Sequence, residues 1–324
     1  MTWRPRNIRA TGAKLVLLAV FSLISACGLE TGGFAEAPDA PRQRDAVEIA
    51  TSSVEESEIR EHLSHLTGVS PAPLAGGETV EIPERGSEEG RRAAAQYMKG
   101  SFEAAGAEAR IIEFDSEAGR GFNVEATVRG TGDRHLWLTA HMDSVDNAGA
   151  NDNASGLTSL LEVAEAVAEV RPEHTVHFVA YDLEEEGLIG SSRYVESTVK
   201  DLRDREGEDA IIGNINSDMI GYEKDAFDAV MGACDQAGAL DDALRRAARE
   251  IDSPIALEEK CLGRSDHEHF WEAGLPALVL TDGSIYDNYP HYHAPSDTAE
   301  KLNVRYLQAT IQLTAAATVR LANP

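Results

Sequence analysis

The chain has 324 residues, of which 42% are hydrophobic and 26% are charged, a composition typical of globular rather than disordered proteins. Its 56 acidic and 29 basic side chains give a net charge of −27, which argues against nucleic acid or anionic lipid headgroups as partners of the folded protein. Two interpretations of the charge stay open, adaptation to high salt and the ordinary acidity of a secreted protein.

The N-terminus has the pattern of a targeting segment. A basic region without any acid precedes an apolar run at 15–26, which is too short to span a bilayer comfortably. The run ends in Ile24-Ser25-Ala26-Cys27-Gly28, which resembles a bacterial lipobox and implies cleavage before Cys27 and lipid attachment to its thiol. The alternative is a plain signal peptide. We expect a signal peptide at 1–26 and an exported protein, anchored to the cell envelope through Cys27 or otherwise secreted.

The next segment lacks any hydrophobic period. Residues 27–50 are rich in Gly, Ala, Pro and charge, so we predict a lipidated cysteine followed by a flexible tether, with the folded domain at 51–324. Cys234 and Cys261 can pair in an oxidising compartment, although the sequence does not show whether they do. No Cys-x-x-Cys is present, which argues against a thiolate zinc site.

Helical and strand patterns alternate along most of the remaining chain. The predicted strands and helices form a single three-layer α/β domain, in which a mixed, mostly parallel β-sheet is flanked by helices. The predicted helices are 54–66, 87–105, 156–170, 191–199, 237–251 and 298–322, and the predicted strands are 109–114, 123–128, 136–140, 175–181, 210–216 and 277–281. Ligands of such sheets bind beyond the carboxyl ends of the strands.

Potential metal ligands follow several of these strands. His141-Met142-Asp143-Ser144 follows the strand at 136–140. A single histidine is more often structural than a ligand. However, a metal-bound imidazole usually donates its second N–H to a carboxylate, and Asp143 is placed for that contact.

Further carboxylates follow in the later loops. Asp152 lies in Gly-Ala-Asn-Asp-Asn-Ala-Ser-Gly, a stretch that also fits a turn and a helix cap. The strand at 175–181 is followed by three glutamates, Glu184 to Glu186, whose mutual repulsion suggests a neutralising cation. Asp218 follows the strand at 210–216, and His293 precedes the last helix. Zinc accepts imidazole nitrogen and carboxylate oxygen, so this edge is a candidate metal site.

Five motifs occur together in a fixed order: His-Met-Asp-Ser, Ala-Asn-Asp-Asn-Ala-Ser-Gly, Glu-Glu-Glu-Gly-Leu-Ile-Gly-Ser, Asn-Ser-Asp-Met-Ile-Gly and Tyr-His-Ala-Pro-Ser-Asp-Thr. Taken together they resemble the secreted bacterial leucyl aminopeptidases with two co-catalytic zinc ions, a family that also contains glutaminyl cyclases. The resemblance covers about 54–322, and its motifs lie between 141 and 298.

The resemblance implies two zinc ions per chain, bridged by Asp152. It assigns His141 and Asp218 to one ion, and Glu185 and His293 to the other. The fold it implies is that of the zinc exopeptidases.

The same resemblance implies the catalytic groups. Glu184 is the general base, and Tyr292 matches a tyrosine that some members use to stabilise the oxyanion. Glu186 falls at a variable position and is expected to face solvent. The family's bridging aspartate often precedes a cis peptide, so Asp152–Asn153 is a candidate for one.

A Ser-Asp-His stretch at 265–267 also resembles the family. Asp143 is expected to orient His141. Asp266 and His267 are expected either to orient metal ligands in the same way or to line the substrate pocket. The alternative is a purely structural capping box formed by Ser265 and Glu268.

The sequence therefore predicts a metallo-aminopeptidase that acts on peptides and contacts membrane only through its lipid anchor. Alternatives with the same fold are a glutaminyl cyclase, which would be an acyltransferase with one zinc, and a carboxypeptidase or dipeptidase. An alternative of another class is a non-catalytic surface lipoprotein.

Overall fold

The computed structural model describes residues 43–223, 227–284 and 288–324. The predicted signal peptide, Cys27 and most of the predicted tether lie outside the described residues.

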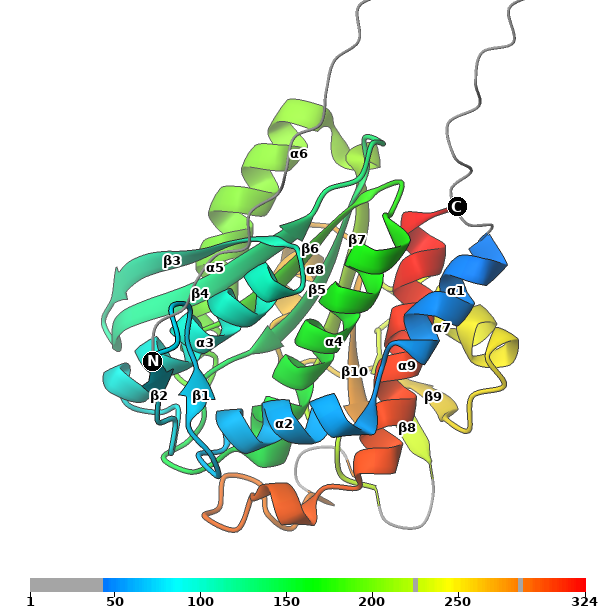
Figure 1. Ribbon diagram of the computed structural model, residues 1–324. Helices are drawn as coiled ribbons and strands as arrows, with labels where there is room; N and C mark the ends of the chain where they lie inside the picture. Colours follow the sequence, from blue (N-terminus) through cyan, green and yellow to red (C-terminus); the bar gives the residue numbers. More distant parts are fainter. Residues whose placement is uncertain (1–42, 224–226, 285–287) are drawn as a thin grey trace, which may run out of the picture. The chain divides into compact units, whose positions relative to one another are not determined.

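An eight-stranded mixed sheet forms the middle layer (Figure 1), with strand order β3-β4-β6-β5-β7-β10-β8-β9. The central strands β6, β5, β7 and β10 are parallel, whereas β4 runs antiparallel to β6 and β8 runs antiparallel to β10. The strands are β3 (Glu108–Ser116), β4 (Gly119–Val128), β5 (His135–His141), β6 (Thr175–Tyr181), β7 (Ile211–Ser217), β8 (Asp228–Gly232), β9 (Ala256–Lys260) and β10 (Ala277–Asp282). A separate two-stranded hairpin pairs β1 (Ala72–Pro73) with β2 (Thr79–Val80). The predicted mostly parallel sheet is confirmed.

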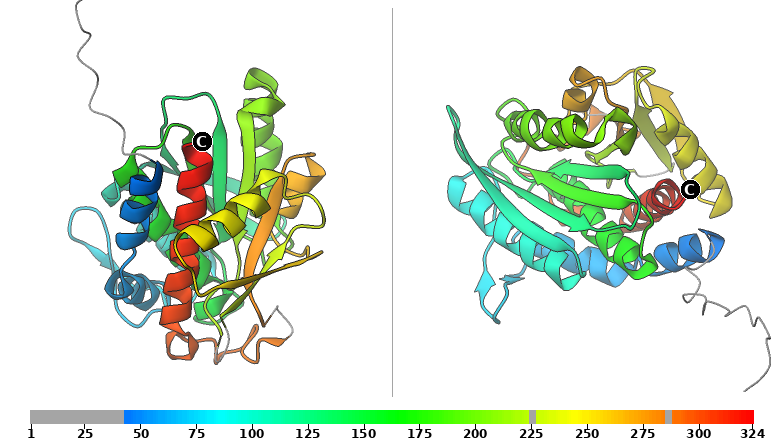
Figure 2. Two further views of the ribbon diagram at one scale, coloured as in Figure 1. Left: turned by 90° about the vertical axis from the view of Figure 1, so that its right-hand side faces the viewer. Right: turned by 90° about the horizontal axis from the view of Figure 1, so that it is seen from above.

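Helices cover both faces of the sheet, which Figure 2 shows in the view from above. One core packs under α1 (Gln43–Ser52), α2 (Glu56–Leu66), α3 (Glu88–Ala104), α4 (Ser155–Val170), α7 (Ala239–Glu250) and α9 (Val304–Ala322). The other core includes residues of α5 (Ile189–Tyr194), α6 (Lys200–Glu206) and α8 (Glu268–Glu272). Every residue of β6 and β7 is buried, as expected for parallel strands covered on both sides. In the described part of the chain, no helix combines the length and apolarity needed to cross a membrane.

The folded domain begins earlier than the sequence suggested. We expected the tether to run through residue 50, but α1 starts at Gln43 and buries Ala46, Val47 and Ala50. The side-chain amide of Gln312 in α9 also donates to the carbonyl of Thr51. Residues 43–50 therefore belong to the domain, because their small apolar side chains pack on the terminal helix.

Strands β8 and β9 were not predicted. Cys234 and Cys261, just beyond the ends of these two strands, form a disulfide, which answers the pairing question that the sequence left open. The last helix is also shorter than predicted, because it starts at Val304 and not at residue 298. The side chain of Asn303 caps it by accepting the N–H of Tyr306.

Candidate metal centre

The loops at the carboxyl ends of β5, β6 and β7 and the loop before α9 bring the five predicted ligands into one cluster. Two sets of three side chains share a residue, and within each set the potential ligand atoms lie within 4.8 Å of one another. The first set is His141, Asp152 and Asp218, and the second is Asp152, Glu185 and His293.

Asp152 is the residue that both sets share, because its two carboxylate oxygens face different histidines. Oδ1 lies 3.1 Å from Nε2 of His141, and Oδ2 lies 3.3 Å from Nε2 of His293. Nε2 of His141 is also 3.6 Å from Asp218 Oδ1, and Nε2 of His293 is 3.0 Å from Glu185 Oε2. A carboxylate with this orientation can bridge two cations.

The donor atoms fit zinc in kind and in spacing. Ligands bound tetrahedrally at about 2.0–2.1 Å from zinc lie about 3.4 Å from one another, close to the separations found here. Oε1 of Glu185 is buried and has no hydrogen-bond partner in the described part of the chain. A buried carboxylate oxygen without a partner is costly unless a cation compensates it.

The asparagines on either side of Asp152 fix it relative to Asp218. The side chain of Asn153 donates to the carbonyl of Ser217 and accepts the N–H of Met219. The Asn151 side chain accepts the N–H of Gly221 at 2.8 Å. The loop that carries Asp152 is therefore bound on both sides to the segment that carries Asp218. The predicted cis peptide between Asp152 and Asn153 is present.

Asp297 holds the same loop from the C-terminal side. Its carboxylate accepts the backbone N–H groups of Asn151 and Asp152, and the hydroxyl of Tyr289 donates to it at 2.6 Å. Asp297 lies in the family motif Tyr-His-Ala-Pro-Ser-Asp-Thr, but no role could be predicted for it, because Asn151 and Asp152 lie far away in the chain.

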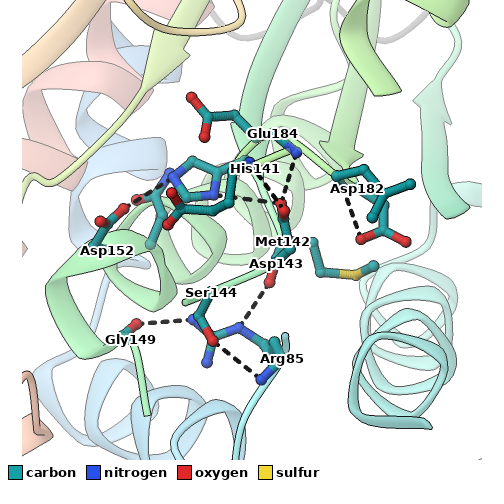
Figure 3. A network of polar contacts seen from close by, with 12 residues as sticks. Arg85, His141, Met142, Asp143, Ser144, Gly149, Asp152, Asp182 and Glu184 are labelled. Atoms are coloured by element: carbon teal, nitrogen blue, oxygen red, sulfur yellow. Dashed lines mark hydrogen bonds and ion pairs between the residues drawn. The ribbon is translucent and has the colours of Figure 1, made fainter. Parts of the chain in front are cut away.

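Asp143 supports the glutamates as well as His141 (Figure 3). Its two carboxylate oxygens accept the backbone N–H groups of Glu184 and Glu185, each at 3.1 Å. One of these oxygens also lies 3.6 Å from Nδ1 of His141. Leu183 has a left-handed conformation, with φ of 58°, and so turns the chain just before the two glutamates. The Asp143 carboxylate thus holds the backbone of both glutamates and lies beside the His141 ring, although at 3.6 Å from Nδ1 it does not accept the hydrogen bond that the sequence predicts.

The electrostatics of the cluster follow from burial and from the close carboxylates. Burial raises the pKa of Glu184 well above its usual value, and the charges of Asp266 and Asp218 raise it further. Burial alone would lower the pKa of His141, but Glu184 and Asp143 are among the carboxylates that raise it well above its usual value. Hydrogen bonds to Asp152 and Glu185 raise the pKa of His293 to about 10. The chain therefore concentrates acidic groups here that favour a positive charge among them.

The remaining predicted residues lie at the rim of the cluster or beside it. Glu186 is exposed, as expected. The ring of Tyr292 stacks on that of His293 with centroids 3.8 Å apart, and burial raises the pKa of Tyr292. Tyr292 is therefore placed beside the second set of ligand atoms.

Asp266 and His267 have different surroundings. Asp266 is fully buried, and burial raises its pKa to about 7, with Asp143 and Asp218 among the charges that raise it. His267 instead donates from Nε2 to the carbonyl of Leu262, at 3.1 Å, and packs edge-on against Trp271. Its described contacts hold the loop at 262–271 and do not reach the ligand cluster.

The capping box suggested for this loop does not form. Ser265 accepts a hydrogen bond from the Asn216 side chain through Oγ, and the Glu268 carboxylate accepts the N–H of Arg264. The two side chains therefore bind partners other than those that a capping box requires.

Comparisons with known proteins show the sequence similarity and the fold. Aminopeptidase YwaD of Bacillus subtilis (strain 168) is 35% identical over 190 residues, which are 56% of this chain and 40% of that protein. The chain thus spans less than half the length of this relative.

Solved structures share the fold. The structure of BSAP, described as a zinc aminopeptidase from Bacillus subtilis, aligns with a TM-score of 0.69 at 17% identity, over 86% of this chain and 95% of that one. Fimbriiglobus ruber glutaminyl cyclase aligns with a TM-score of 0.65 at 19% identity, over 82% and 95%. At these identities the structural likeness establishes the architecture alone. The same architecture occurs in the aminopeptidase and in the glutaminyl cyclase.

A match to a single family extends from β4 to α9 and includes every residue of the candidate centre. It covers residues 123–318, which is more than half of the chain, and its description is Peptidase family M28. This chain belongs to Peptidase family M28.

Proposed function

We propose that this chain is a zinc-dependent aminopeptidase that removes N-terminal residues from peptides. The observation that carries the proposal is the position of Asp152, whose two carboxylate oxygens face His141 and His293. Membership of Peptidase family M28 and the names of YwaD and BSAP support the same activity.

Two zinc ions fit the residues present. His141, Asp152 and Asp218 would hold one, and Asp152, Glu185 and His293 would hold the other. Bound zinc would supply Lewis-acid polarisation of the scissile carbonyl and would activate the attacking water.

Glu184 is proposed as the general base. Its carboxyl group belongs to a set with His141 and Glu185 whose ligand atoms lie within 4.8 Å of one another, so it lies beside the cluster. From there it takes a proton from the attacking water and delivers it to the leaving amine. Tyr292 is placed to donate a hydrogen bond to the oxyanion of the substrate.

A panel of aminoacyl anilides tests the activity. We expect hydrolysis of substrates with a free amine, no hydrolysis of the same substrates when the amine is acylated, and loss of the activity in a chelator. Hydrolysis of blocked substrates contradicts the aminopeptidase assignment. Release of C-terminal residues would indicate a carboxypeptidase, and cyclisation of N-terminal glutamine would indicate a glutaminyl cyclase.

Metal analysis separates the enzyme from a non-catalytic surface lipoprotein. We expect two zinc ions per chain after purification in the presence of zinc. A chain that binds no zinc, and stays inactive when zinc is added, would indicate a protein that uses the fold for binding.

We also propose that the protein is exported and attached to the cell envelope through a lipid on Cys27. The basic and apolar segments before Cys27 and its lipobox-like surroundings support this location. The disulfide between Cys234 and Cys261 is compatible with an oxidising compartment. Peptides are the proposed partners, and the net charge of −27 argues against nucleic acid.

A further inference from the structure

Arg85 is a fully buried arginine whose side chain binds backbone carbonyl groups. Its exposed fraction is 0%, and it is among the largest side chains to be buried completely. In the described part of the chain, the acceptors of its side-chain hydrogen bonds are all backbone carbonyl groups. A buried guanidinium is costly unless its donors are bound, so the identity of its acceptors indicates its role.

Three acceptors lie on the one loop that connects His141, the last residue of β5, to Asp152 (Figure 3). Nε of Arg85 donates to the carbonyl of Met142 at 2.7 Å, next to His141. Nη1 donates to the carbonyl of Ala148 at 2.7 Å, and Nη2 donates to the carbonyl of Gly149 at 2.8 Å. Arg85 thus connects the chain on both sides of the turn between the two ligands.

The backbone of Arg85 strengthens this connection. Its N–H donates to Oγ of Ser144 at 3.1 Å, and its carbonyl accepts the N–H of Ser144 at 3.3 Å. Gly149 has a left-handed φ of 54°, and a Cβ at that position would lie 2.7 Å from Nη2 of Arg85. The loop before Asp152 therefore approaches the guanidinium too closely for a larger residue.

The fourth acceptor anchors the arginine to the helical layer. Nη1 also donates to the carbonyl of Leu66, the last residue of α2, at 2.5 Å. The carbonyl groups at a helix C-terminus lack intrahelical partners and carry a partial negative charge, so a cation is favourable there. The guanidinium of Arg85 therefore connects the end of α2 to the loop between His141 and Asp152.

The charge of Arg85 also acts on the acidic groups of the centre. Although burial lowers its pKa to about 10, Arg85 stays protonated at neutral pH, and the charges of Asp297, Asp143 and Asp152 favour the protonated form. A permanently charged guanidinium near these carboxylates reduces the electrostatic repulsion among them.

From these contacts we infer that Arg85 is a positioning residue that sets the separation of His141 and Asp152. It thereby holds two members of the first ligand set, His141, Asp152 and Asp218, in position to bind zinc. This inference rests on the proposed metal centre. Arg85 makes no hydrogen bond to a ligand side chain, and it acts through the backbone of the loop between His141 and Asp152.

The test compares zinc affinity in folded variants. Lysine keeps the charge but offers one nitrogen in place of the planar fork that reaches four carbonyls. We expect Arg85→Lys to stay folded by near-ultraviolet circular dichroism and to bind zinc about 10–100-fold more weakly in competition with a chromophoric chelator. The absorption spectrum of the cobalt-substituted variant should also differ from that of the wild type. Arg203→Lys is the matched control, because half-buried Arg203 donates to the carbonyl of Ala273 on the other face of the sheet.

Each result decides between the alternatives. A folded Arg85→Lys variant that binds zinc within two-fold of the wild type overturns the inference. A variant whose zinc binding falls only in proportion to its folded fraction overturns it as well. If Arg85→Lys fails to fold, Arg85→Ala is refolded with millimolar guanidinium and compared with refolding in urea of equal concentration. Guanidinium that restores both fold and zinc binding supports the inference, and failure to restore zinc binding overturns it. A wild-type protein that binds no zinc would instead refute the proposed metal centre.

Discussion

The carboxylate of Asp297 accepts the backbone N–H of Asp152 through Oδ2 at 3.0 Å, although the two residues are 145 positions apart in sequence. Its other oxygen accepts the N–H of Asn151 and the hydroxyl of Tyr289. All three donors lie in or beside loops of the candidate centre. The orientation of the shared ligand therefore depends on a residue that precedes the last helix.

Asp297→Asn is expected to weaken zinc binding about 10–100-fold while the protein stays folded. The amide replaces one of the acceptor oxygens with an NH₂ group, which then faces a backbone N–H. We would measure zinc affinity by chelator competition and folding by circular dichroism. Tyr289→Phe is the control, because it removes one donor to Asp297 and keeps both backbone contacts; its effect should be smaller. Equal affinities in Asp297→Asn and the wild type would show that the carboxylate does not orient Asp152.

Glu184→Gln is expected to lower kcat about 10²–10⁴-fold and to leave the zinc content unchanged. Glutamine keeps the size of the side chain but cannot accept the proton of the attacking water. Steady-state kinetics on an aminoacyl anilide and metal analysis of the same preparation check both expectations. Near-normal turnover would mean that another group is the base.

Glu186→Ala is expected to change kcat and zinc affinity less than two-fold, whereas Glu185→Ala should lose zinc. Glu186 is exposed, but Glu185 lies 3.0 Å from Nε2 of His293. The two variants differ by one position in the same run of glutamates, so each controls for the other. A large loss of zinc in Glu186→Ala would show that the assigned register is wrong by one residue.

Glu162→Gln is expected to stabilise the protein more at pH 8 than at pH 5. The Glu162 side chain is 4% exposed, and burial followed by the charges of Glu58 and Glu165 raises its pKa to about 8. Between the ordinary carboxyl pKa, 4.5, and about 8, the unfolded chain has lost this proton and the folded chain keeps it. The free energy of unfolding of the wild type therefore falls as pH rises from 4.5 to about 8. Above about pH 8, Glu162 causes no further fall.

Urea unfolding at the two pH values measures this effect. The advantage of Glu162→Gln should grow by on the order of 1–3 kcal/mol from pH 5 to pH 8, after allowance for relaxation and water entry. Nε2 of His62 lies 3.8 Å from the Glu162 carboxylate, but burial lowers the pKa of His62 to about 4, so the folded protein keeps it neutral at both pH values. Glu165→Gln, an exposed neighbour on the same helix, removes one of the charges that raise this pKa, so it should stabilise the protein at pH 8 by less than Glu162→Gln. An advantage that is the same at both pH values would exclude a protonated Glu162.

Much of the centre was predictable because its ligands follow the strand ends directly. A central parallel strand is a buried apolar run, and the first polar residues after it lie at the carboxyl edge of the sheet. His141, Glu184 and Asp218 were therefore locatable from local pattern. Assigning a role to each side chain required the family resemblance, because no single segment of the sequence indicates how far apart the loops lie.

The misses have a common physical origin in long-range packing. Strand β9 has the sequence Ala-Leu-Glu-Glu-Lys and is mostly exposed, so neither its composition nor its periodicity favours a strand. It pairs with β8 in register, and the disulfide between Cys234 and Cys261 joins the loops that follow the two strands. The role of Arg85 was not predictable for a related reason. Its acceptors are backbone carbonyl groups, which every residue carries, so the acceptor positions have no characteristic sequence.

The sharing of one cluster by widely separated loops has a consequence for synthesis of the protein. His141 and Asp152 lie in the first half of the chain, whereas His293 and Asp297 lie just before the final helix, α9. The second set of ligand atoms needs His293, and the two backbone contacts that hold the Asp152 loop need Asp297. A chain whose synthesis stops before residue 293 therefore keeps His141, Asp152 and Asp218 but lacks the second set of ligand atoms.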